Sequence, residues 1–150
     1  NTERSIEGIN NNLAYPATYN KQHNFSTTFS YEVSERFNIS SIFKYTSGGF
    51  ITVPEGTFNH YGASFGYYSS RNGYKLPSYH RMDISATLKL KKNTNRKWQG
   101  EWSFGIYNLY NRKNIFSLFV KQNPEYLAQS KAYKMYLYGA SPYVSYNFKF

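Results

Sequence analysis

Five segments of the chain alternate apolar and polar residues with a period of two. They cover about residues 24–33, 37–46, 81–90, 98–107 and 143–150. Successive side chains of an extended strand point to opposite faces, so this period predicts a strand whose two faces lie in different environments. No segment carries a convincing helical period. The pattern therefore predicts an all-β protein built of antiparallel strands.

The polar faces of these strands collect the charged residues. All seven ionisable side chains of the five segments fall on them: Glu32, Lys44, Arg81, Asp83, Lys89, Glu101 and Lys149. A Lys or Arg at the middle of a bilayer costs about 2–4 kcal/mol, so a lipid-facing surface requires such a separation. Each segment is also close to the ~9–11 residues that a tilted strand needs to cross the hydrocarbon. We therefore expect transmembrane strands with the seven charges facing the lumen of a barrel.

The connections between these segments alternate in length. About three residues join the first two segments, and residues 91–97 join the third and fourth, whereas residues 47–80 and 108–142 form long connections. Short periplasmic turns and long external loops are typical of outer-membrane barrels. We therefore place the long loops outside the cell, residues 1–23 at the end of another such loop, and the C-terminus in the periplasm. Within the last long loop, residues 115–120 could extend a strand beyond the membrane.

Alternation alone does not say which face meets lipid, because a β-sandwich or a lipocalin-like barrel has the same period with its apolar face inward. Besides the loop lengths, aromatic residues near strand ends favour the membrane, where they form interfacial girdles. These are Tyr31, Tyr45, Trp98, Tyr107 and Tyr143. The chain also ends in a pattern that resembles the signal read by the barrel-assembly machinery. It consists of Val144, Tyr146, Phe148 and Phe150.

The composition agrees with strands that have one apolar and one polar face, and it excludes several other classes of protein. Aromatic residues make up 21% of the chain, yet the mean hydropathy is −0.69. No apolar run approaches the ~18 residues of a membrane helix, which excludes helical spans only. The polar residues 1–12 do not form a signal peptide. If the protein is exported, we expect its export signal to lie upstream of this sequence. The absence of cysteine excludes a disulfide framework and a thiolate metal site.

The net charge of +10 raises the question of a nucleic-acid partner. The densest basic run is residues 91–97, a polar turn between two apolar-patterned segments, and the other basic residues are scattered. A charge run at a turn is more often a solvated tip than a binding site. We therefore predict no nucleic-acid partner.

Candidate chemistry is sparse. Gly62-Ala63-Ser64-Phe65-Gly66 matches the G-x-S-x-G pattern of a nucleophile elbow, which requires a strand-to-helix turn together with acid and His partners. The sole Asp of the chain, Asp83, lies on a predicted strand, and no helix follows the motif. His23, His60 and His80 are isolated and do not have metal-ligand spacing. We predict no catalytic activity, no metal site and no cofactor.

Two further groups of residues have candidate roles. We expect the charges Arg81, Asp83, Glu101, Lys89 and Lys44 to pair across neighbouring strands, as a structural lattice. The long loops are rich in tyrosine, which offers contact area at a low entropic cost. The candidates for contact with a ligand or a lipoprotein lid, or for simple packing of the loops, are Tyr61, Tyr67, Tyr68, Tyr74, Tyr133, Tyr136 and Tyr138.

Several sequence blocks resemble TonB-dependent receptors of the Bacteroidota type. Residues 76–86 (LPSYHRMDISA) are similar to a return strand of that family, 102–114 (WSFGIYNLYNRKN) to its penultimate strand and 145–150 (SYNFKF) to its last strand. Residues 15–23 (YPATYNKQH) and 43–54 (FKYTSGGFITVP) resemble the approach to a late strand and the loop after it.

This resemblance implies a 22-stranded transmembrane barrel of which the five segments are the last strands, and a transporter for the energised uptake of a scarce nutrient. The implied partners are the remaining strands and a plug domain, a TonB-type energy transducer, the assembly machinery, lipid and lipopolysaccharide, with a surface lipoprotein as a further candidate. The plug has no counterpart in these 150 residues, so we expect it elsewhere. The alternative is a passive porin or a small outer-membrane barrel acting as an adhesin, and a soluble carbohydrate- or nucleic-acid-binding β domain ranks third.

Overall fold

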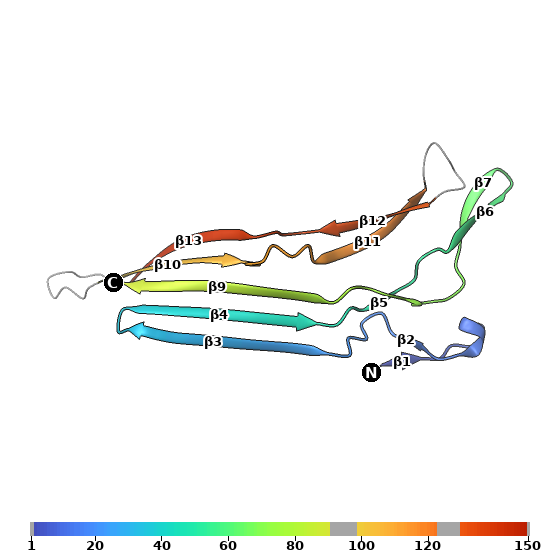
Figure 1. The fold of residues 1–150 in the computed structure, drawn as a ribbon. Helices are drawn as coiled ribbons and strands as arrows, with labels where there is room; N and C mark the ends of the chain where they lie inside the picture. Colours follow the sequence, from blue (N-terminus) through green and yellow to red (C-terminus); the bar gives the residue numbers. More distant parts are fainter. Residues whose placement is uncertain (1, 91–98, 123–129, 150) are drawn as a thin grey trace. The chain divides into compact units, whose positions relative to one another are not determined.

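The computed structural model of the chain describes residues 2–90, 99–122 and 130–149 (Figure 1). Within these ranges the protein is all β with antiparallel sheets, which confirms the predicted class. A single 3-10 turn, η1 (Asn10–Asn12), is the only helical element of the described chain. No helix in this part of the chain has the length and apolar character needed to cross a membrane.

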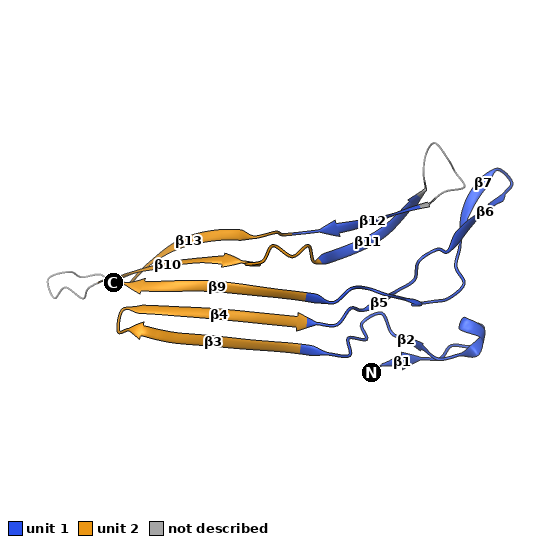
Figure 2. Ribbon diagram, viewed as in Figure 1, with its two compact units in different colours: residues 1–24, 46–79, 115–137 blue, residues 25–45, 80–114, 138–150 orange. Residues whose placement is uncertain are grey.

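The chain divides into two compact units, which Figure 2 shows in different colours. Unit 1 comprises residues 1–24, 46–79 and 115–137, and unit 2 comprises residues 25–45, 80–114 and 138–150. The chain therefore passes repeatedly between the units, and each is described by itself below.

Unit 2 is built on a five-stranded sheet whose strands, taken in chain order and without the short strands of unit 1, each pair with the next. Its order is β13-β10-β9-β4-β3. The bounds are Asn24–Ser34 for β3, Phe37–Thr46 for β4, Tyr79–Lys89 for β9, Gln99–Tyr107 for β10 and Ser141–Lys149 for β13. These bounds lie within two residues of the five alternating segments. Trp98, the basic run 91–97 and Phe150 lie outside the described residues.

The register of this sheet joins like faces of neighbouring strands. Apolar side chains stand opposite one another in the rows Leu88–Trp102–Tyr146 and Ala86–Phe104–Val144. Polar side chains do the same in the rows Lys89–Glu101–Asn147 and Thr87–Ser103–Ser145. A slip of one residue would mix the two faces, so the alternation fixes the register.

Side-chain hydrogen bonds run across the polar face. Asn38 Nδ2 donates to Ser30 Oγ at 3.0 Å, which links β3 to β4. The hydroxyl groups of Ser40 and Ser85 lie 2.7 Å apart and link β4 to β9. Those of Thr87 and Ser103 lie 3.4 Å apart between β9 and β10. The predicted polar face thus carries a side-chain hydrogen bond between each neighbouring pair of these four strands.

The apolar face of the sheet is uncovered within unit 2. Val144 is 69% exposed and Phe29 is 63% exposed. The described residues contain just two buried hydrophobic side chains, Tyr15 and Ala17, and both belong to unit 1. In the described chain the sheet also keeps two unpaired edges, β3 and β13, and does not close on itself.

Unit 1 contains four small two-stranded antiparallel sheets. They pair β1 (Glu3–Arg4) with β2 (Tyr15–Pro16), β5 (Phe50–Ile51) with β8 (Tyr74–Lys75), β6 (Gly56–His60) with β7 (Ala63–Tyr67), and β11 (Ile115–Gln122) with β12 (Ser130–Tyr136). The connections predicted as long loops therefore contain short paired strands of their own. The segment 115–120, predicted as a strand extension, lies within β11.

The hairpin of β6 and β7 shows why the short strands of unit 1 could not be predicted from the sequence pattern. Tyr61 (φ 48°) and Gly62 (φ 78°) form its two-residue turn. Positive φ at both central residues is typical of a type I′ turn, in which Asn or Asp usually precedes Gly. Tyr in that place hides the turn, and five-residue strands give too short an alternation to stand out.

Candidate functional site

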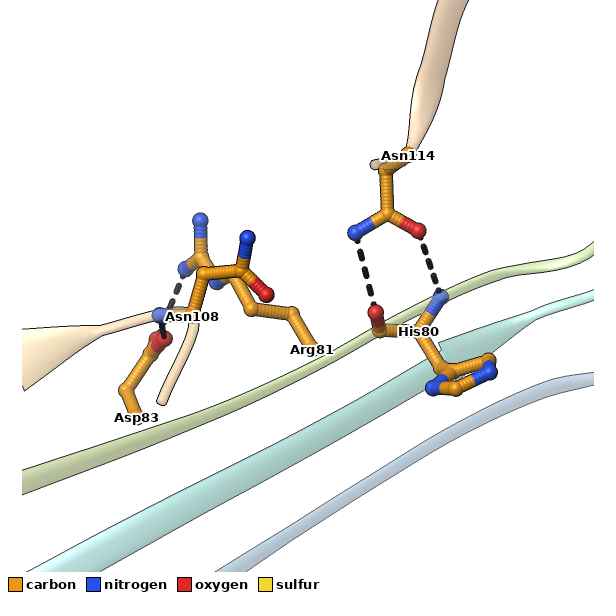
Figure 3. A network of polar contacts seen from close by, with 5 residues as sticks. All are labelled: His80, Arg81, Asp83, Asn108 and Asn114. Atoms are coloured by element: carbon orange, nitrogen blue, oxygen red, sulfur yellow. Dashed lines mark hydrogen bonds and ion pairs between the residues drawn. The ribbon is translucent and has the colours of Figure 1, made fainter. Parts of the chain in front are cut away.

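A cluster of polar side chains lies where β9 begins and β10 ends in unit 2 (Figure 3). Its centre is the buried carboxylate of Asp83. One oxygen of this carboxylate accepts the backbone N–H of Asn108 at 2.9 Å, and the other lies 2.8 Å from Nη2 of Arg81. A buried carboxylate is costly unless it is paired and hydrogen-bonded, and both conditions are met here.

Asn108 holds the turn that follows β10. It is 2% exposed and has a φ of 53°, a left-handed conformation that Asn tolerates better than most residues. Its side-chain oxygen accepts the N–H of Arg112 at 3.1 Å, and its Nδ2 donates to the carbonyl oxygens of Arg112 (2.9 Å) and Tyr138 (3.3 Å). One side chain thereby joins the end of β10 to the segment that leads into β13.

Asn114 binds the backbone of His80 on both sides. Its Oδ1 accepts the N–H of His80 at 3.2 Å and its Nδ2 donates to the carbonyl oxygen at 2.9 Å, as Figure 3 shows. The amide thus imitates one residue of a neighbouring strand. The His80 ring stacks on Tyr45 at 6.4 Å, and its Nδ1 lies 2.7 Å from Tyr110 Oη.

This cluster positions the chain and offers little for chemistry. Its amides and its carboxylate are engaged with protein groups, and the described residues gather no set of three or more His, Cys, Asp or Glu side chains that could hold a metal. The G-x-S-x-G motif lies elsewhere, with Gly62 in a hairpin turn and Ser64 in β7. Residues 62–66 therefore lack the strand-to-helix turn of a nucleophile elbow.

The predicted lattice of charge pairs across neighbouring strands is wrong for Arg81 and Asp83. These two residues pair along the same strand, because side chains two residues apart share a face. Asp83 is directed by its second partner, the N–H of Asn108. Glu101 does stand opposite Lys89 in register, but within the described chain the ion pair of Arg81 with Asp83 is the only one closer than 4 Å.

That the other charged side chains face the lumen of a barrel remains a prediction. Within the sheet, the neighbours opposite Glu101 and Lys149 are polar: Asn147 and Lys89 for the first, Gln99 for the second. Glu32 and Lys44 lie on β3 and β4 at positions that share the face of Ser30 and Ser40.

The candidate loop tyrosines do not form one cluster. Tyr61 is at a hairpin turn and is 97% exposed, while Tyr67, Tyr74, Tyr133 and Tyr136 belong to β7, β8 and β12. Tyr138 belongs to unit 2, where Asn108 binds its carbonyl oxygen. Tyr68 lines a hollow in unit 1.

On the strand expected to carry the assembly signal, Tyr146 packs against Trp102 of β10 with ring centroids 4.7 Å apart. Gly100 makes room for the phenol group of Tyr146, because a Cβ there would overlap it. Val144 and Phe148 share this face of β13, and Phe150 lies outside the described residues.

Comparison of the chain with models of protein families, with curated proteins and with solved structures finds no match. The sequence pattern did not reveal the roles of Asn108 and Asn114. The one signal for them is the density of asparagine after a predicted strand, since Asn is favoured in turns and in left-handed backbone.

Proposed function

We propose that this chain forms part of the wall and the external loops of an outer-membrane β-barrel of the TonB-dependent receptor type. The observation that carries the proposal is the two-faced sheet of unit 2. Its apolar and polar rows match across β9, β10 and β13, and none of the hydrophobic side chains described in unit 2 is buried.

The apolar face is best satisfied by lipid chains. Burying apolar area is worth roughly 25 cal/mol per Å², and unit 2 offers no second layer for that purpose. The opposite face carries hydroxyl, amide and charged groups that bond to one another and suit a water-filled or plugged lumen. A soluble sandwich would instead cover its apolar face with a second sheet.

The free edges support further strands as partners. Unpaired backbone groups in hydrocarbon cost several kcal/mol each, so a sheet in a membrane must be paired at both edges. In this proposal β3 and β13 pair with further strands of a closed barrel, and the family resemblance implies 22 strands in all. The same resemblance supplies the plug, the energy transducer and the assembly machinery as partners.

The connections support a topology with loops on one side. β3 and β4 are joined by the two residues Glu35 and Arg36, whereas β4 and β9 are separated by residues 47–78, in unit 1. Outer-membrane barrels have short periplasmic turns and long external loops. This proposal therefore places unit 1 outside the cell and the end of β13 in the periplasm.

The test compares lysine substitutions on the two faces of one strand. Phe104→Lys should abolish or strongly reduce insertion of the intact protein, whereas Ser103→Lys, one residue away, should insert almost normally. Membrane fractionation and heat-modifiable migration on gels measure insertion. Equal tolerance of both substitutions would overturn the membrane assignment.

A second arm separates energised uptake from the porin or adhesin alternative. In cells with the inserted protein, dissipating the proton gradient with a protonophore should stop nutrient accumulation through a TonB-dependent receptor. Diffusion through a passive porin would continue under the same treatment, and that result would replace the receptor by a porin.

A further inference from the structure

An open hollow of about 570 Å³ lies in unit 1. We call it the Arg71 hollow; the residues that matter for its chemistry are Asn10, Asn11, Tyr68, Ser69, Ser70 and Arg71. Its volume falls within the ~300–1,000 Å³ typical of small-molecule sites. None of these residues takes part in the polar cluster of unit 2.

One wall of the Arg71 hollow has an unusual backbone. Asn10, Asn11 and Asn12 have φ values of 52°, 55° and 63°, and Gly8 has a φ of 80°. Residues other than glycine rarely adopt this left-handed backbone conformation, and a run of three such residues is rarer still. Gly8 N–H donates to Asn12 Oδ1 at 2.7 Å and holds the turn closed. Such backbone persists where its surroundings fix it, and it gathers at ligand sites.

Hydrogen bonds between distant segments fix the walls to each other. The Asn10 side chain accepts the N–H of Arg71 at 2.7 Å and donates to its carbonyl oxygen at 3.0 Å. The buried Asn72 accepts from Thr18 and donates through Nδ2 to the carbonyl oxygen of Pro16 at 2.8 Å. The hollow is therefore preorganised, which lowers the entropic cost of binding.

The edge of the Tyr68 ring has a close neighbour beside this hollow. A Cβ added at Gly66 would lie 3.2 Å from Cε2 and from Oη of Tyr68, so this edge of the ring lies against Gly66. A ring held in this way offers a flat apolar surface with a hydroxyl at its edge. The C–H face of a sugar ring fits such a surface.

The polar groups of the Arg71 hollow define the other half of a ligand. Ser69 and Ser70 offer hydroxyls and Asn11 offers an amide, which suit a ligand with many hydroxyl groups. Arg71 is the charged side chain among the described lining residues, and they include no carboxylate. A guanidinium group binds a carboxylate through two parallel hydrogen bonds.

We propose that the Arg71 hollow binds a carboxylated saccharide, with the sugar ring on Tyr68 and the carboxylate on Arg71. Binding itself stands on the geometry of unit 1, whereas its role as the recognition step of nutrient uptake rests on the proposed function.

The experiment measures binding of digalacturonate to the intact protein by titration calorimetry, beside the neutral disaccharide digalactose. Saturable binding of the acid at an affinity at least tenfold above that of the neutral sugar is expected. Arg71→Gln should weaken binding of the acid by tenfold or more and leave the neutral sugar unchanged. Lys75→Gln removes the same charge within unit 1, outside the lining, and should have no effect.

Asn10→Ala provides a second variant, which keeps Arg71 but removes its two hydrogen bonds to the opposite wall. It should weaken both sugars together. No saturable binding of digalacturonate, equal binding of the neutral sugar, or an Arg71→Gln variant with unchanged affinity would each overturn the proposal.

The outcomes separate this inference from the proposed function. If Phe104→Lys blocks insertion while digalacturonate fails to bind, only the assignment of the hollow fails. If digalacturonate binds as expected while Phe104→Lys inserts normally, the barrel proposal fails and the saccharide site remains.

Discussion

The two units of this protein are ordered by different means. In unit 2 the same relation repeats along β9, β10 and β13, in rows where apolar residues stand opposite apolar ones and polar opposite polar. In unit 1 the order depends on a few single residues, such as Asn72, which binds two other segments at residues 16–18 and at Thr52, and Gly48, which lies against a backbone carbonyl. A repeated pattern spreads its stability over many positions, so single substitutions in the two units should have unequal effects.

The largest effect is expected for Gly48→Ala. A Cβ at Gly48 would overlap the carbonyl oxygen of Leu76, so the backbone must move. We expect a loss of about 3 kcal/mol or more in local stability, with rapid hydrogen exchange in unit 1 and little change in unit 2. Gly56→Ala is the matched control, because a Cβ there meets nothing within 4 Å. Similar exchange in both variants would remove the contrast between the units.

Asn72→Ala should come next. The substitution leaves the carbonyl oxygen of Pro16 without its donor and places Ala at a φ of 55°. We expect about 2–3 kcal/mol of destabilisation, read as faster proteolysis within unit 1. Asn59→Ala in β6 serves as the control, since Asn59 is exposed. Equal proteolysis of the two variants would mean that the Asn72 hydrogen bonds contribute nothing.

Phe148→Ser tests the apolar face of β13. In the proposed membrane barrel, burial of this aromatic side chain in lipid is worth about 1.5–3 kcal/mol, a loss that a large finished barrel should tolerate. The expected defect is therefore in assembly, with less protein in outer-membrane fractions and normal ligand affinity in what remains. Asn147→Ser, on the opposite face, should leave abundance unchanged. Normal abundance of Phe148→Ser would argue against an assembly signal in this strand; the same reasoning applies to Phe150.

The smallest effect is expected for Ser40→Ala. Its hydroxyl lies 2.7 Å from that of Ser85, one of several separate hydrogen bonds that cross the polar face between neighbouring strands. We expect about 0.5–1 kcal/mol of destabilisation, measured by the denaturant midpoint of the protein in detergent. The double variant with Ser85→Ala should be no less stable than the single variants combined. A loss comparable to that of Asn72→Ala would mean that the sheet also depends on single residues.

The sequence predicted what repeats and missed what does not. The period of two revealed the five long strands because each has nine or more residues in two different environments. The hairpin of β6 and β7 was missed because its strands are short and its turn has Tyr where Asn or Asp is usual. The bond of Asn10 to Arg71 joins residues 61 positions apart, and no local pattern encodes such a pairing.

The candidate sites followed the same rule. The polar face of the sheet could be predicted because parity along a strand determines the face. The Arg71 hollow could not, since its walls come from three separate parts of the sequence and only Tyr68 had been a candidate. The sequence also did not predict that Arg81 and Asp83 pair along one strand. The orientation of Asp83 depends on the N–H of Asn108, which lies at the end of another strand.

The side-chain amide of Asn114 has a consequence for how the sequence of this protein can evolve. The Asn114 side chain occupies both the N–H and the carbonyl group of His80. Strand pairing at His80 is therefore replaced by this one side chain. Asn108 fixes the other side of the same exit through Arg112 and Tyr138. Insertions and deletions between residues 115 and 137 can then accumulate without shifting the pairing of β9, β10 and β13. Selection can thus diversify the loop while the sheet keeps its register.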